Sequence, residues 1–138
     1  MRRVFADSAY WIALRNRNDP FHSRARKIAA SLIQNRCAIV VTPFVFAESY
    51  AFFCRVREIR ELVIRDFWKN PLVTIEQATF QDQGAAVEIL SEHDDKSYSF
   101  ADAVSFVIMN RLRLQEVATF DNHFRQFGHF SVLDGSSL

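Results

Sequence analysis

The sequence predicts an α/β protein with a three-layer α/β/α arrangement, in which helices cover both faces of a central parallel sheet of four to five strands. Short apolar segments alternate with longer helical patterns along the whole chain, as strand–helix–strand units do. The apolar segment 37–41 is continuous and rich in β-branched residues, which is typical of a strand buried on both faces of a parallel sheet. Gly and Pro number only three each in 138 residues, so few long loops are expected. The length fits a single domain over 1–138.

Apolar spacing and turn residues predict the elements of the first half. Strands are expected over 4–6, 37–41 and 72–75, and helices over 8–16, 20–35, 44–53 and 55–70. Pro20 opens the second of these helices. Thr42 is placed as the N-cap of the third, with Pro43 at its first position, where the missing N–H has no cost. The helix over 55–70 is expected to continue directly from the one before it.

The second half repeats the alternation. Helices are expected over 79–92, 103–112 and 123–125, and strands over 116–120 and 130–133. The segment Ser99 to Asp102 opens the second of these helices, and Gly128 stops the third. Consecutive strands joined by helices predict parallel pairing with helices on both faces.

The charge balance excludes a strongly basic protein, because the net charge is only +1. Nucleic-acid binding would then depend on local patches, for which Arg15, Arg17 and Arg24 are the candidates. Cys37 and Cys54 lie in apolar segments, which favours buried free thiols in a reducing compartment. No signal-peptide core and no run of ~20 apolar residues is present, so a cytoplasmic protein without a membrane segment is expected.

Four carboxylates are expected at the carboxyl end of the sheet, where open parallel sheets bind ligands. Asp7 directly follows the first strand and Asp121 the fourth, while Glu48 lies in the second turn of the helix after 37–41. Asp102 lies in the first turn of a helix that runs back along the strands, so it belongs at the same end. The four acids should therefore converge.

Three of these acids also have a purely structural interpretation. Asp7 and Asp121 suit helix N-caps, and Asp102 suits the acid of a capping box with Ser99. Glu48 is too far into its helix to cap it, and its apolar neighbours leave it little solvated face. A charge there is costly unless it is paired, exposed in a cleft or bound to a metal.

A shared divalent cation would resolve the repulsion between these acids, which is roughly 4 kcal/mol for a pair ~4 Å apart at an effective dielectric of ~20. Oxygen ligands without regularly spaced His or Cys point to Mg²⁺ or Mn²⁺ rather than Zn²⁺. The scattered histidines are interpreted as surface or structural residues, although His123 lies only two residues after Asp121. Such a cluster beside arginines suits hydrolysis of a phosphodiester.

Four segments, each holding one of the acids, resemble the PIN domain, and most closely the VapC-type toxins of bacterial toxin–antitoxin pairs. They are Ala6 to Leu14, Thr42 to Glu48, Asp95 to Ala103 and Ala118 to Asp121, and 122–128 also match. The resemblance implies an endoribonuclease that depends on Mg²⁺ or Mn²⁺, a homodimer, and a protein antitoxin that covers the active-site groove. It assigns Asp7, Glu48, Asp102 and Asp121 as catalytic metal ligands, Asp95 as an accessory acid, and Thr119 as a hydrogen-bond partner of the cluster.

Two further functions remain open. One is a non-catalytic RNA-binding or partner-binding module in which the acids hold a structural cation or cap helices. The other is a phosphoacceptor signalling domain of receiver type, which also carries acids at strand ends. A receiver domain needs a Lys after its last strand, whereas here Asp134, Gly135 and Ser136 follow the last strand. The leading prediction is the metal-dependent ribonuclease.

Overall fold

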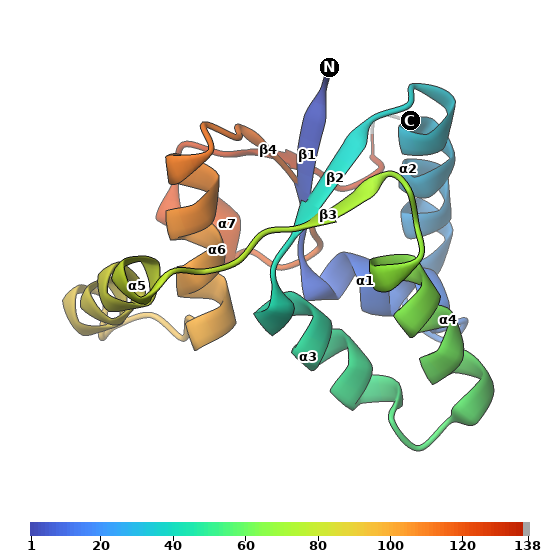
Figure 1. Ribbon diagram of the computed structural model, residues 1–138, viewed down its shortest axis with the longest axis horizontal. Helices are drawn as coiled ribbons and strands as arrows, with labels where there is room; N and C mark the ends of the chain where they lie inside the picture. The colour runs from blue at the N-terminus through green and yellow to red at the C-terminus, as the bar shows by residue number, and fades with distance from the viewer. Residues whose placement is uncertain (137–138) are drawn as a thin grey trace.

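Five parallel strands form the centre of the computed structural model, which describes residues 1–136 (Figure 1). The strands are β1 (Arg3–Ala6), β2 (Ala38–Val41), β3 (Val73–Ile75), β4 (Glu116–Ala118) and β5 (Ser131–Leu133). Every neighbouring pair in the sheet is parallel. The predicted α/β class with a parallel sheet flanked by helices is confirmed.

Helices flank this sheet on both sides. They are α1 (Ser8–Arg15), α2 (His22–Gln34), α3 (Pro43–Phe53), α4 (Arg57–Trp68), α5 (Phe80–Glu92), α6 (Phe100–Arg111) and α7 (His123–Phe127). In Figure 1, α1, α2 and α4 lie to the right of the strands and α5, α6 and α7 to the left, while α3 extends below the end of β2. Among residues 1–136, no helix has both the length and the apolar character needed to cross a membrane.

The strand order is β3-β2-β1-β4-β5, so the connections run outward in one direction from β1 and then in the other from β4. This reversal places a crevice outside the carboxyl ends of β1 and β4, which is where open α/β sheets bind ligands. Ala6 pairs with Ala118 at the end of the β1–β4 ladder. The residues that follow each strand, Asp7 and Thr119, therefore leave the sheet side by side.

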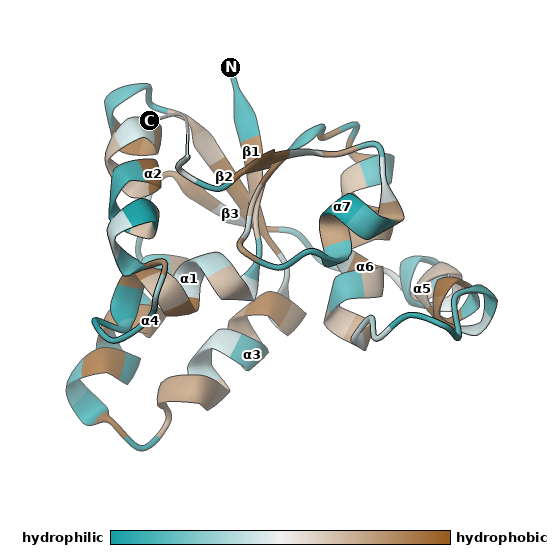
Figure 2. Ribbon diagram, turned by 180° about the vertical axis from the view of Figure 1, so that it is seen from behind, coloured by the Kyte–Doolittle hydropathy of each residue, from teal (hydrophilic) through white to brown (hydrophobic). Residues whose placement is uncertain are grey.

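The hydrophobic core lies between the strands and the helices that cover them. Val4, Phe5 and Ala6 of β1 are fully buried, as expected for the middle strand of a parallel sheet. Helix α6 is almost as buried, with Phe106 packed against Phe124 of α7. Apolar residues mark much of the strands and the inner sides of the helices in Figure 2, whereas hydrophilic residues mark outer parts of α2 and α7.

Some element boundaries differ from the prediction. The expected continuous helix through 54–56 is wrong, since α3 ends at Phe53 and α4 begins at Arg57. Cys54 lies in this break and is exposed, so the expectation that both cysteines are buried holds for Cys37 only. Strand β4 ends at Ala118, two residues earlier than predicted, and α2 begins at His22 rather than at Pro20.

Candidate active site

A buried carboxylate stands at the end of β1. The backbone N–H of Asp7 continues the sheet by donating to the carbonyl of Ala118 at 3.1 Å. The Thr119 hydroxyl donates to Asp7 Oδ2 at 3.0 Å and accepts from the Asp121 amide at 3.1 Å. One hydroxyl therefore connects two of the predicted acids, because the β1–β4 register places it between them.

The second oxygen of Asp7 has no partner. Asp7 is only 2% exposed, and its Oδ1 is buried without a hydrogen bond within residues 1–136. Burial, together with the charges of Asp102 and Glu48, raises the pKa of Asp7 to about 7, against the opposing effect of the Thr119 hydrogen bond. Asp7 occupies the N-cap position of α1, but its side chain makes no capping hydrogen bond, so the cap interpretation of this side chain is wrong.

The carboxylate of Asp102 makes two kinds of contact. It completes the predicted capping box of α6, because its Oδ2 accepts from the Ser99 amide at 3.0 Å and its own amide donates to Ser99 Oγ at 3.0 Å. The same Oδ2 lies 2.7 Å from Nδ1 of His123. The cap fixes this carboxylate in the first turn of α6, pointing toward the α7 segment.

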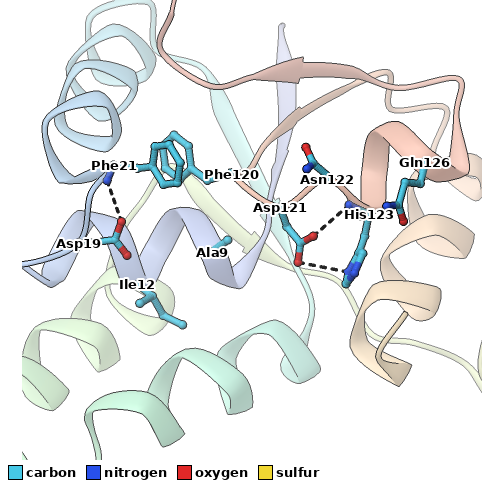
Figure 3. A pocket seen from close by; sticks show the side chains of 9 residues that line it. All are labelled: Ala9, Ile12, Asp19, Phe21, Phe120, Asp121, Asn122, His123 and Gln126. Carbon is cyan, nitrogen blue, oxygen red and sulfur yellow. Dashed lines mark hydrogen bonds and ion pairs between the residues drawn. The ribbon is translucent and has the colours of Figure 1, made fainter. Parts of the chain in front are cut away.

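Asp121 and His123 approach Asp102 from the loop after β4 and from the start of α7. The His123 amide donates to Asp121 Oδ1 at 3.0 Å, and His123 Nδ1 lies 3.2 Å from Asp121 Oδ2 (Figure 3). One ligand atom from each of Asp102, Asp121 and His123 lies within 4.8 Å of the other two. His123 was not predicted as a site residue, and its spacing two residues after Asp121 was the only sign in the sequence.

Glu48 reaches the same region from the second turn of α3. Its side chain is half-buried, and its Oε1 accepts from the Ser8 hydroxyl at 2.9 Å. Burial raises the pKa of Glu48, as do the charges of Asp102 and Asp121, whereas the Ser8 hydrogen bond lowers it. These charge effects place the four predicted acids in one electrostatic neighbourhood. Ser8 is a site contact that the sequence did not indicate.

One premise about Glu48 was wrong. Ala47 and Phe52 on α3 are exposed, so the helix has an open face rather than apolar packing all round. Glu48 itself lies between that open face and the core, at intermediate exposure. A half-exposed acid can be reached by a ligand from solvent, which suits a site more than a fully enclosed carboxylate would.

The remaining predicted residues lie elsewhere or make other contacts. Asp95 lies in the segment between α5 and α6, is 71% exposed and pairs with Lys96 at 3.8 Å. Arg15 donates to Asp66 through two nitrogens, with Nε 2.8 Å from Oδ2, so its guanidinium is engaged in a structural ion pair. Arg17 and Arg24 are exposed. Of the three arginines, Arg15 is therefore the one that this structure removes from a free basic patch.

A depression of about 540 Å³ opens beside the acids (Figure 3). Its lining residues are Ala9, Ile12, Asp19, Phe21, Phe120, Asp121, Asn122, His123 and Gln126. Asp121 and His123 line this depression and also lie beside Asp102, so the depression borders the acids directly.

The donor set fits a hard divalent cation. Carboxylate oxygens of Asp7, Asp102 and Asp121 are the ligands that Mg²⁺ and Mn²⁺ prefer, and the orphaned Oδ1 of Asp7 lacks any other partner within residues 1–136. Several buried acids close together favour either protonation or a bound cation. We name Asp7, Glu48, Asp102 and Asp121, together with the histidine His123, the acidic cluster.

This chain is similar to known proteins in sequence and in fold. The family model described as PIN domain matches residues 4–129. The 23S rRNA-specific endonuclease VapC20, from two strains of Mycobacterium tuberculosis, is 29% identical over 130 residues, which are 94% of this chain and 97% of that protein. The crystal structure of Mycobacterium tuberculosis VapC20, described as a sarcin-ricin loop cleaving toxin, matches with a TM-score of 0.83 and 26% identity, over 91% of this chain and 95% of the other.

Proposed function

Because this chain belongs to the PIN domain family, we propose that it is a metal-dependent endoribonuclease that hydrolyses phosphodiester bonds in RNA. The acidic cluster is the proposed active site, with Asp7, Glu48, Asp102 and Asp121 holding one or two cations. Support comes from the 29% identity to a 23S rRNA-specific endonuclease over nearly the full length of both chains. Ribosomal RNA is therefore the first substrate to test.

The single observation that carries the proposal is the buried, unpartnered Oδ1 of Asp7. A buried polar atom without a partner costs free energy, of order 1–3 kcal/mol. The Thr119 hydroxyl donates to the other oxygen, Oδ2, and the charges of Asp102 and Glu48 act on the same carboxylate, so a cation would remove this cost. We propose Mg²⁺ or Mn²⁺ because the donors are carboxylates.

A bound divalent cation would lower the pKa of a coordinated water and neutralise charge on the phosphate. The residues of the chain hold the carboxylates in place. Thr119 orients the carboxylate of Asp7 and accepts from the backbone N–H of Asp121, Ser8 orients Glu48, and Ser99 orients Asp102. His123 bridges Asp102 and Asp121 through Nδ1, and we propose that it sets the separation of these two acids.

The partners of this ribonuclease are part of the proposal. The solved relative is described as a toxin, so we propose that this chain is the toxin of a toxin–antitoxin pair whose antitoxin covers the acidic cluster. We also propose a homodimer, as the family resemblance implies. Co-expression with the product of a small neighbouring gene, followed by size-exclusion chromatography with light scattering, tests both.

Cleavage of purified ribosomal RNA in controlled metal tests the enzymatic proposal. The protein should cut the RNA in Mg²⁺ or Mn²⁺, stop in excess chelator and recover when metal is restored. Glu48→Gln should remove cleavage, whereas Glu61→Gln, at an exposed position of α4, should not. Equal cleavage with and without chelator would contradict the proposal. RNA binding without cleavage would favour the non-catalytic binding module.

A further inference from the structure

Two phenylalanine rings lie parallel at one end of the depression beside the acidic cluster. Phe21 comes from the segment before α2 and Phe120 from the segment after β4. Their ring centroids are 4.8 Å apart and their planes differ by 3°. Phe21 is 37% exposed, and Figure 3 shows the overlapping rings facing the same hollow as Asp121 and His123.

This pair lines the depression, whereas the other stacked rings within residues 1–136 do not. Phe106 stacks on Phe127 with centroids 4.3 Å apart, but Phe106 is fully buried in the core. Phe21 and Phe120 instead keep part of their apolar surface in contact with water beside a polar site. Exposed apolar surface in a depression is removed from water when a flat apolar ligand binds there.

Groups around the rings suit a nucleotide. The exposed amides of Asn122 and Gln126 line the depression and offer both donors and acceptors, as recognition of a base edge requires. The guanidinium carbon of Arg24 lies 5.8 Å from the centroid of Phe21, within the range of a cation–π contact. Its positive charge therefore lies near the rings, where it can attract a phosphate of the RNA strand that carries the base.

We propose that Phe21 and Phe120 form a stacking platform for an unpaired nucleobase of the RNA substrate, next to the phosphodiester that is cut at the acidic cluster. This inference rests on the proposed ribonuclease function and adds a base-binding subsite to it. Single-stranded RNA is recognised by stacking of splayed bases on aromatic rings, with polar side chains contacting the base edges. The substrate class is therefore RNA in which the nucleotide beside the cut is unpaired.

The experiment measures RNA affinity in the Glu48→Gln background, where the RNA stays intact. A single-stranded RNA oligonucleotide containing one site that wild type cleaves is compared with a series in which each position in turn is abasic. Phe21→Leu and Phe120→Leu keep apolar volume but remove the aromatic face, and each should weaken binding of the intact RNA about tenfold. Phe120→Trp should retain the affinity. Phe80→Leu is the matched control, because Phe80 is 92% exposed on α5 and does not line the depression.

The abasic series separates stacking from a general packing role. Removing the base at one position beside the cut should weaken binding to the Phe120-containing protein about as much as Phe120→Leu weakens binding of the intact RNA. In the Phe120→Leu variant, removing the same base should weaken binding little further. Unchanged affinity in both leucine variants, or equal losses at every abasic position, would overturn the platform. Failure of wild type to cut RNA in either metal would overturn the proposed function instead. Circular dichroism and thermal unfolding confirm that each variant is folded.

Discussion

Two groups of buried acids in this protein are treated in opposite ways. Asp66 and Asp82 are each held by an arginine, Arg15 for the first and Arg111 for the second, whose Nη2 lies 3.0 Å from Asp82 Oδ2. Asp7 and Asp102 are just as buried, but within residues 1–136 neither pairs with a lysine or an arginine. Arginines of the chain neutralise Asp66 and Asp82. Asp7 and Asp102 instead lie near each other, and Asp102 contacts His123.

This difference separates structural acids from the proposed site. A buried carboxylate with an arginine partner links two elements, as Asp66 links α4 to α1. Burial and the charges of Asp102 and Glu48 raise the pKa of Asp7, and no arginine or lysine within residues 1–136 pairs with it to offset this cost. A cation from outside the chain would supply the counter-charge that Asp7 and Asp102 lack within residues 1–136.

Neutralising Asp7 should have the largest effect. Asp7→Asn should lower RNA cleavage about a thousandfold, since a lost metal ligand removes several kcal/mol of transition-state stabilisation and each ~1.4 kcal/mol is tenfold in rate. The melting temperature should stay the same or rise, because the substitution removes a buried charge. Initial cleavage rates and thermal unfolding measure both effects. Asp94→Asn, at an exposed position, is the control, and wild-type cleavage by Asp7→Asn would refute the assignment.

Asp7 and Asp82, one from each group, should contribute to the pH dependence of stability with opposite signs in the metal-free protein. Asp7 has an ordinary pKa of 3.8 that rises to about 7 in the folded state, so the folded protein binds more protons between those values. Its contribution therefore makes the free energy of unfolding fall as pH rises from about 4 to about 7, by up to a few kcal/mol. Urea unfolding in chelator should show this slope in wild type and less of it in Asp7→Asn, and added Mg²⁺ should also reduce it.

Asp82 contributes a free energy of unfolding that changes with pH in the opposite direction. Burial alone would raise the pKa of Asp82, but hydrogen bonds from Thr79 and Arg111 lower it below its ordinary value. Its stabilisation is present above its ordinary pKa of 3.8 and is lost as pH falls through the lower folded value. If the slopes of wild type and Asp7→Asn coincided between pH 4 and 7, the distinction between the groups would fail.

Neutralising a structural acid should reduce stability and leave RNA cleavage unchanged. Asp66→Asn leaves Arg15 partly buried without its counter-ion, so the free energy of unfolding should fall by ~2 kcal/mol, less than the roughly 3–5 kcal/mol of a fully enclosed pair. Cleavage per folded molecule should stay at the wild-type rate. Urea unfolding and a titrated cleavage assay test this. A large loss of activity without a loss of stability would show that Asp66 belongs to the active site and is not a structural acid.

The smallest effect concerns the hydroxyl between Asp7 and Asp121. Thr119→Val keeps the shape but removes the hydrogen bond to Asp7, which should reduce cleavage about fivefold to tenfold and stability by ~1 kcal/mol. Thr119→Ser keeps the hydroxyl and should retain most of the activity. Equal rates for the valine and serine variants would show that this hydroxyl does not position the acids.

Local patterns predicted the type of every element, but not the contacts between distant ones. The Thr42 cap with Pro43 and the Ser99–Asp102 capping box were readable because their partners are three residues apart or fewer. The break between α3 and α4 contains neither Gly nor Pro, so nothing local marks it. The Arg15–Asp66 pair joins residues 51 positions apart, and the strand order also depends on contacts between distant segments. Local spacing cannot reveal either.

The same limit explains the site. The positions of Asp7, Glu48, Asp102 and Asp121 at strand ends or in helix turns followed from chain order. The inclusion of His123 depends on where α7 begins and on the direction of its first side chain. The cap assigned to Asp7 failed because its carboxylate contacts Thr119, which follows β4 and is distant in sequence, and makes no capping hydrogen bond with α1.

The pairing of β1 with β4 also determines when during synthesis the acidic cluster can exist. Thr119 and Asp121 are synthesised more than a hundred residues after Asp7. A ribosome-bound chain that has not yet released β4 from the exit tunnel lacks the hydroxyl that orients Asp7 and lacks one of the four acids. A growing chain is therefore without its complete site until β4 and the segment after it have left the tunnel, so more than a hundred residues of a ribonuclease built this way are synthesised without a cutting centre.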